Sequence, residues 1–264
     1  MAHKARKRFG QNFLQDHNII SNILSHIQLD ENQHWVEIGP GLGALTEPLL
    51  QEKVKLDIIE LDRDLVAYLS EKFKNYDNLT IHSADALNFD FSTLTSNDEK
   101  LRIIGNLPYN ISTPLMFHLL DSSAQIEDMH FMLQKEVVDR ICAEPGSKKY
   151  GRLSVMMQYF CETEFLFEVP PESFDPAPKV MSAIVRLQPY TKPIVSVYNF
   201  KTLNDVVTQA FSQRRKTIRN SLGKLISEAQ IAALGIDPNL RAESLTLTEF
   251  AELSNLVVQQ SMSL

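Results

Sequence analysis

The stretch LRIIGNLPYN, residues 101–110, joins an apolar run to a polar loop and indicates how this chain folds. Leu101 to Ile104 are typical of a buried strand. Ser112-Thr113-Pro114 follow the loop and predict a helix start with proline near its first position. Gly105 to Asn110 should therefore lie at the carboxyl edge of a sheet, where open α/β sheets bind ligands.

Four residues of this loop suit the recognition of a flat base that carries an amino group: Asn106, Leu107, Pro108 and Tyr109. The Asn106 amide oxygen and the Pro108 carbonyl oxygen can accept hydrogen bonds from an amine. The Tyr109 ring can stack on the base. The alternative is a polar loop in which Pro108 only stiffens a turn, and the four residues alone do not decide between the two.

Strands and helices alternate around this stretch. Apolar runs predict strands at residues 35–38, 54–61, 79–82, 101–104, 129–133, 165–169 and 183–187. Helical spacing between most of them predicts an α/β fold with a parallel, doubly wound sheet. Residues 200–262 show only helical periodicity. We therefore expect a sheet domain over residues 1–190 and a small all-helical domain over residues 191–264.

The composition is that of a globular protein with two local basic patches. The net charge of −7 argues weakly against nucleic acid, but the distribution of charge matters more than its sum. One patch lies within the first eight residues, and the other lies between Lys201 and Lys224, where six basic residues face one acid. The chain has two cysteines without metal-ligand spacing, no apolar leader and no run of ~18 apolar residues. We expect a cytoplasmic protein without a membrane segment.

A glycine turn, Glu37 to Gly43, lies between a predicted strand and a predicted helix. Gly39 and Gly41 allow a sharp turn and the close approach of a ligand. Glu60 closes the next strand, where a carboxylate can bind both hydroxyls of a ribose. Both nicotinamide dinucleotides and S-adenosylmethionine fit this layout, and the turn alone does not separate them. A tight turn without any ligand is the third alternative.

Asp85 and Ala86 follow the third strand of this series. A carboxylate there can accept a hydrogen bond from the exocyclic amine of an adenine ring. Alone, Asp85 is better explained as a helix cap or turn residue. Polar groups nevertheless follow four consecutive predicted strands, and packing alone does not explain that arrangement.

Longer motifs resemble the small-subunit ribosomal RNA adenine dimethyltransferases, the family of the bacterial kasugamycin-sensitivity enzyme. The resemblance covers nearly the whole chain without a departure in its motifs, which are residues 6–14, 37–43, 60–62, 85–86, 105–112, 133–137, 150–154 and 174–180. It implies a Rossmann-like class I methyltransferase sheet and transfer of methyl groups from S-adenosyl-L-methionine to the N6 amines of two adjacent adenosines. Those adenosines lie in the 3′-terminal hairpin loop of 16S rRNA, within an immature small ribosomal subunit.

The resemblance also implies roles for individual residues. The cofactor-binding residues would be Gln11, Asn12, Leu14, Glu37, Gly39, Gly41, Glu60, Leu61, Asp85, Ala86 and Asn106. The catalytic residues would be Asn106, Leu107, Pro108 and Tyr109, and Gln11, Asn12 and Leu14 would close over the cofactor. Base-stacking chemistry and the clustering of positive charge, beside the resemblance, favour a set of substrate-binding residues: Tyr109, Phe174, Arg214, Arg215, Lys216 and Arg219. We expect no metal site and a monomeric protein.

The chemistry agrees with these residues. An adenine amine is a poor nucleophile, whereas a methyl group on a sulfonium is already activated, so alignment matters more than a metal or a strong base. Phe174 could cover the second face of the base, and its alternative is a core anchor under a loop. For the basic residues 214–219 the alternative is a solvated helix end, which the scarcity of nearby acids disfavours.

Rival functions are a methyltransferase of the antibiotic-resistance type that modifies large-subunit RNA, a non-catalytic ribosome-assembly factor, and a nicotinamide dehydrogenase. The form of the Phe174 to Val180 motif and the full-length match disfavour the first. The intact loop from Asn106 to Tyr109 disfavours the other two.

Overall fold

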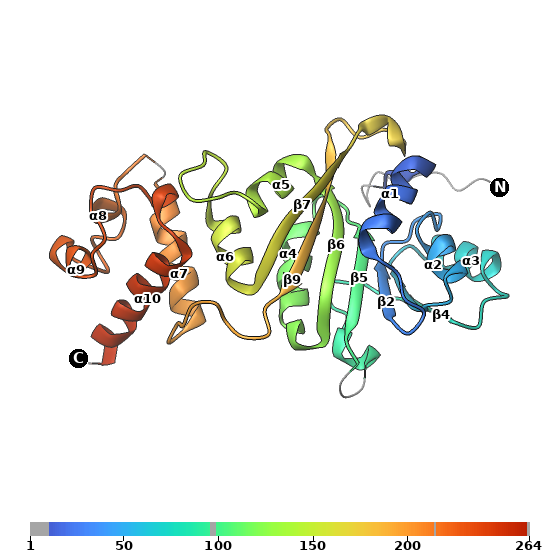
Figure 1. Cartoon of the computed structure of the whole chain (residues 1–264), viewed down its shortest axis with the longest axis horizontal. Helices are drawn as coiled ribbons and strands as arrows, with labels where there is room; N and C mark the ends of the chain where they lie inside the picture. Colours follow the sequence, from blue (N-terminus) through green and yellow to red (C-terminus); the bar gives the residue numbers. More distant parts are fainter. Residues whose placement is uncertain (1–10, 96–98, 214, 263–264) are drawn as a thin grey trace. The chain divides into compact units, whose positions relative to one another are not determined.

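The chain forms two compact units in a computed structural model that describes residues 11–95, 99–213 and 215–262 (Figure 1). The first unit contains residues 1–138 and 164–189, and the second contains residues 139–163 and 190–264. The domain boundary expected near residue 190 lies where the chain passes from the first unit to the second, between residues 189 and 190. Residues 139–163, which the sequence pattern assigned to the sheet domain, instead group with the C-terminal helices. Aromatic packing explains this grouping, because the Tyr150 and Phe211 rings lie 6.2 Å apart, edge to face.

The predicted α/β sheet is confirmed. It has seven strands in the order β4-β3-β2-β5-β6-β9-β7. The strands are β2 (His34–Ile38), β3 (Lys55–Glu60), β4 (Leu79–Ser83), β5 (Leu101–Asn106), β6 (Ile126–Gln134), β7 (Cys161–Val169) and β9 (Ser182–Pro189). Strands β4, β3, β2, β5 and β6 run parallel to one another, and β9 is antiparallel to β6. The carboxyl ends of β2 to β5 therefore meet at one edge.

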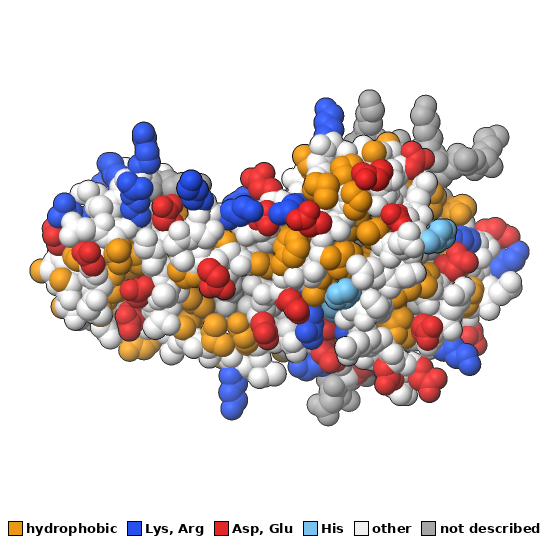
Figure 2. Space-filling view, turned by 45° about the horizontal axis from the view of Figure 1, so that its top comes forward, with side chains coloured by type: hydrophobic (Ala, Val, Ile, Leu, Met, Phe, Trp, Pro, Cys, Tyr) orange, Lys and Arg blue, Asp and Glu red, His pale blue; other side chains and the backbone are white. Residues whose placement is uncertain are grey.

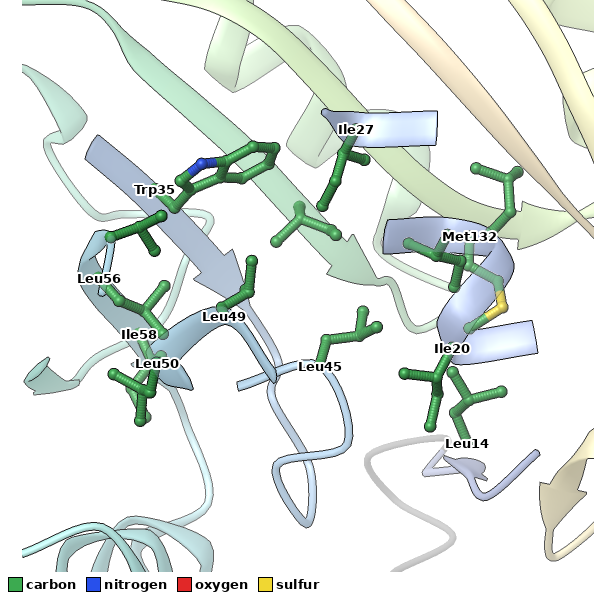
Figure 3. Packing of buried hydrophobic residues seen from close by; sticks show 14 of the residues in the cluster. Leu14, Ile20, Ile27, Trp35, Leu45, Leu49, Leu50, Leu56, Ile58 and Met132 are labelled. Atoms are coloured by element: carbon green, nitrogen blue, oxygen red, sulfur yellow. The ribbon is translucent and has the colours of Figure 1, made fainter. Parts of the chain in front are cut away.

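Helices follow most strands of this sheet. They are α2 (Thr46–Gln51), α3 (Arg63–Lys72), α4 (Ser112–Leu120) and α5 (Lys135–Ile141), and α1 (His17–Ile27) precedes the first strand of the sheet. Capping residues define two of their starts, since the Asp16 and Asp62 side chains accept backbone N–H bonds at the beginnings of α1 and α3. Trp35, Leu56 and Ile58 of the sheet pack in one apolar cluster with residues of α1 and α2 (Figure 3). This cluster holds the strand ends rigidly in place.

A two-stranded sheet near the amino terminus has no counterpart in the sequence analysis. Strand β1 (Phe13–Leu14) pairs antiparallel with β8 (Phe174–Asp175), so that Leu14 lies opposite Phe174. The Gln15 N–H also donates to the Ser173 carbonyl at 2.9 Å. These bonds fix the segment after residue 10. The basic patch of the first eight residues lies outside the described residues.

The second unit is helical in its C-terminal part. Its helices are α6 (Arg152–Phe160), α7 (Phe200–Phe211), α8 (Ile218–Ser221), α9 (Glu228–Ala233) and α10 (Leu247–Met262). Helix α7 buries Leu203, Val206 and Val207, which recur at helical spacing. Within the described ranges, no helix combines the length and apolar character needed to cross a bilayer.

Candidate active site

A cavity of about 300 Å³ lies within the first unit, where β2, β3, β4 and β5 end. The structure brings together at this cavity every residue that the sequence analysis proposed for catalysis or cofactor binding. Its lining includes Gln11, Asn12, Leu14, Glu37, Gly39, Gly41, Glu60, Leu61, Asp85, Ala86, Asn106, Leu107, Pro108 and Tyr109. Residues from five separate segments of the chain thus share one concave site.

The glycine turn after β2 forms one wall of the cavity. Gly39 and Gly41 have φ angles of 67° and 60°, in the left-handed region where a Cβ is unfavourable. A Cβ on Gly41 would also lie 2.9 Å from the Phe13 ring. The turn therefore needs glycine for its own geometry. Without side chains at these two positions, its backbone is also accessible from the cavity.

Two buried carboxylates face this cavity. Burial raises the pKa of Glu37 to about 7, although the Thr46 hydroxyl donates a hydrogen bond to it. Burial also raises the pKa of Glu60, whose Oε1 accepts the Asp62 N–H at 2.7 Å. Within the described part of the chain, no Lys or Arg forms an ion pair with either carboxylate. Such uncompensated acids favour a ligand that supplies positive charge or hydroxyl donors.

Leu61 and Asp85 line the cavity beside these acids. The Leu61 side chain is 51% exposed, which is unusual for a large apolar residue and offers a surface for a flat ring. Asp85 stabilises its own turn, because Oδ1 accepts the Leu87 N–H at 3.0 Å and Oδ2 accepts the Asn88 amide at 2.9 Å. The turn role named as the alternative is therefore present. Each carboxylate oxygen still has a second acceptor site.

Hydrogen bonds orient the loop after β5. The Asn106 Nδ2 donates to the Asn12 carbonyl at 2.9 Å, so the amide oxygen points to the other side of that group. No donor among the described residues reaches this oxygen. The Pro108 carbonyl accepts the Ile111 N–H at 3.1 Å and retains one lone pair. Leu107 is buried, and its N–H donates to the Met132 carbonyl, which anchors the loop to β6.

Tyr109 and Phe174, the two aromatic residues proposed for the base, differ in their surroundings. Tyr109 is half-buried at the cavity, and its hydroxyl lies 2.8 Å from the Ser182 Oγ. Phe174 is only 5% exposed and belongs to the apolar cluster, next to Leu14 across the small sheet. It is not among the residues that line the cavity. Its position agrees with the core-anchor alternative. Ser182 was missed because no local pattern links it to residue 109.

The basic residues proposed for RNA lie in the second unit. Arg215 and Lys216 are exposed in the turn between α7 and α8, and Figure 2 shows Lys and Arg side chains gathered on one side of this unit. Arg219 is also exposed, but it forms an ion pair with Glu228 at 3.2 Å. Arg214 lies outside the described residues.

The fold and this cavity define a class of proteins. The class I methyltransferases share the arrangement seen here. Their sheet is parallel except for one antiparallel strand, which is β9 in this chain and lies beside β6. A glycine turn follows the first strand of the sheet, and an acid follows the second. A model of the ribosomal RNA adenine dimethylase family matches residues 2–259. The chain belongs to this family.

Curated relatives and solved structures agree with this assignment. "Ribosomal RNA small subunit methyltransferase A" from Marinomonas is 54% identical over 98% of this chain and 97% of its own. The protein of that name from Pseudomonas aeruginosa is 54% identical over 97% and 96%. A dimethyladenosine transferase from Plasmodium falciparum superposes with a TM-score of 0.77 at 25% identity, over 96% of this chain and 98% of that one. The 23S rRNA methyltransferase ErmE gives a TM-score of 0.74 at 25% identity, over 94% and 100%.

Proposed function

We propose that this protein transfers methyl groups from S-adenosylmethionine to the N6 amines of two adjacent adenosines in the 3′-terminal hairpin loop of 16S rRNA. The observation that carries the proposal is the single cavity that unites two uncompensated carboxylates with the loop from Asn106 to Tyr109. The substrate is an immature small ribosomal subunit, and the protein acts as a monomer. Identity of 53–54% to small-subunit enzymes, against 25% to ErmE, favours this RNA over large-subunit RNA.

The cavity fits the proposed cofactor. Glu60 would accept the hydroxyls of a ribose, and Leu61 would pack against an adenine ring whose amine reaches Asp85. Glu37 would lie near the positively charged end of the cofactor, which would compensate the charge of the buried carboxylate. Gln11, Asn12 and Leu14 would cover the bound molecule, with β1 held in place by β8.

The residues of this chain supply alignment. A bound S-adenosylmethionine would supply an activated methyl group, whose transfer would form the new N–C bond as the S–C bond breaks and would leave the electron pair on sulfur. The Asn106 amide oxygen and the second lone pair of the Pro108 carbonyl would accept the amine hydrogens, which localises the nitrogen lone pair. The nitrogen then releases one proton to water, and no strong base is required. Tyr109 would stack on the base after it leaves its loop.

Methylation of small subunits that lack these modifications tests the proposal. The protein and S-adenosylmethionine should convert two adjacent adenosines to N6,N6-dimethyladenosine, mapped by mass spectrometry of RNA fragments. Asn106→Ala should lower the single-turnover rate by about 10²–10³-fold, as for the loss of one preorganised polar partner, and leave RNA affinity nearly unchanged. Modification of large-subunit RNA instead, or a normal rate for Asn106→Ala, would refute the proposal.

A further inference from the structure

Ser182 is a wholly buried residue that contacts the proposed base-stacking tyrosine. It is the first residue of β9 and lies opposite Gln134 of β6. Its Oγ lies 2.8 Å from the Tyr109 hydroxyl, which is hydrogen-bond distance for two hydroxyl groups. The contact joins the loop after β5 to a strand that lies two positions away in the sheet. It is therefore a long-range contact that ties a cavity residue to the rigid part of the fold.

This contact fixes the free end of the Tyr109 side chain. The other end is held by the backbone, where the Tyr109 carbonyl accepts a hydrogen bond from the Ser112 hydroxyl at 3.2 Å. Tyr109 is only half-buried, so this hydrogen bond adds to packing in holding the ring axis in one place. Burial also raises the pKa of the Tyr109 phenol, which therefore stays neutral and can share a hydrogen with Ser182 at physiological pH.

We infer that Ser182 is a positioning residue that holds the axis of the Tyr109 ring, and with it the surface on which the target adenine stacks, in place at the cavity. This inference rests on the proposed function. Ser182 does not touch the base or the cofactor. It acts through the tyrosine hydroxyl, because a ring axis held at both ends stays beside the cavity and loses little further entropy when the base binds. Loss of the anchor leaves the stacking surface present but poorly oriented.

A double-mutant cycle with Tyr109→Phe and Ser182→Ala tests the inference. Both variants remove the hydrogen bond and keep the ring, and Ser182→Ala removes only one buried oxygen. Single-turnover methyl transfer is measured at saturating cofactor and RNA. Each variant should slow the reaction by about 2- to 12-fold, the value of one neutral hydrogen bond. The double variant should be no slower than the slower single variant, since both substitutions remove the same interaction.

A second readout does not depend on methyl transfer. The target adenosine is replaced by 2-aminopurine in an RNA hairpin, and its fluorescence in the complex reports stacking on Tyr109. Ser182→Ala and Tyr109→Phe should change this emission to the same extent, while cofactor affinity stays at the wild-type value. Ser254→Ala is the matched control, because Ser254 is also wholly buried but lies on α10 in the other unit. It should leave both readouts unchanged.

The outcomes separate this inference from the proposed function. A wild type that leaves the adenosines unmodified refutes the proposed function and the inference with it. In a second outcome the wild type is active, and the rate loss of the double variant equals the product of the losses in the two single variants. Ser182 then acts independently of Tyr109, and only the inference is overturned. Normal rates and normal emission in both single variants overturn it equally.

Discussion

Buried carboxylates on one face of the sheet differ in how their charge is balanced. In the register of the sheet, Trp35 of β2 lies beside Arg102 of β5, and Arg102 lies beside Asp128 of β6. Glu37 follows Trp35 by two residues along β2. Because side chains alternate between the two faces of a strand, these four side chains lie on one face. Asp128 accepts two hydrogen bonds from the Arg102 guanidinium, at 2.8 and 2.7 Å. Glu37 and Glu60, at the carboxyl edge, have no such cation among the described residues.

The difference separates a structural site from a binding site. The Arg102 guanidinium also lies 4.4 Å from the Trp35 ring centroid and donates to the Gln33 side chain. This ion pair is thus satisfied entirely by the protein. The Glu37 and Glu60 carboxylates lie against a cavity, and burial raises the pKa of both. Buried charge that the protein leaves uncompensated is a place where a ligand can complete the balance.

The largest effect is expected from breaking the satisfied pair. Asp128→Ala leaves the Arg102 guanidinium buried without its partner and should lower the free energy of unfolding by about 3–5 kcal/mol. Denaturant titration measures the loss. Replacing both partners together, Arg102→Met with Asp128→Leu, should cost less, because no buried charge remains. Cofactor affinity of the folded variants should match the wild type. A loss of affinity larger than the loss of stability would contradict the structural role.

The next effect concerns the pH dependence of stability at Glu37. Its pKa in the folded protein, about 7, is above the ordinary value of 4.5 for a glutamate. Between these values the folded state binds more protons than the unfolded state, so stability falls as pH rises from 4.5 to 7. A shift of this size corresponds to about 3 kcal/mol above pH 7. Glu37→Gln should therefore raise the free energy of unfolding at about pH 8 and change it little near pH 4.5, with cofactor absent. The same difference at both pH values would contradict a buried, uncompensated acid.

Glu60 provides a smaller and more direct test of ligand binding. Glu60→Ala should weaken S-adenosylmethionine binding by roughly 1.5–3 kcal/mol, the range for a hydrogen bond to a charged group. Isothermal titration at constant pH measures it. Glu47→Ala is a suitable control, since that acid is exposed and pairs with Lys72. Equal affinity in Glu60→Ala and the wild type, or tight binding of NAD, would remove the acid from the cofactor site.

The sequence predicted this cavity because its parts follow local rules. A parallel sheet brings strand ends to one edge, so Glu37, Glu60, Asp85 and Asn106 could be placed together from the strand pattern alone. The apolar runs that define those strands are strong signals, although β5 extends to Asn106, beyond the apolar residues.

The remaining contacts depend on residues far apart in the chain. The β1–β8 pairing joins two-residue strands separated by about 160 positions, and neither is long enough to produce a pattern. The Tyr109–Ser182 and Arg102–Asp128 contacts depend on which strands become neighbours, and β9 enters the sheet out of sequence order. Phe174 is a further example. Its motif alone did not distinguish a base-stacking residue from a core residue, and in the structure its side chain is buried in the apolar cluster.

Exposed charges are a third kind of charged site, beside the paired acid and the acids at the cavity. Their replacement is expected to have the smallest effect. Arg215 and Lys216 are exposed in the turn between α7 and α8, so their replacement removes little folding energy. If they bind RNA phosphates, Arg215→Ala with Lys216→Ala should lower the slope of log binding constant against log salt concentration by about 0.7–0.9 for each phosphate that is no longer neutralised. Filter binding across a salt series measures the slope, and Lys74→Ala, an exposed lysine of the first unit paired with Glu71, is the control. Cofactor affinity should be unchanged, because these residues do not line the cavity. An unaltered slope would mean that the cluster is a solvated helix end and that the RNA phosphates bind elsewhere.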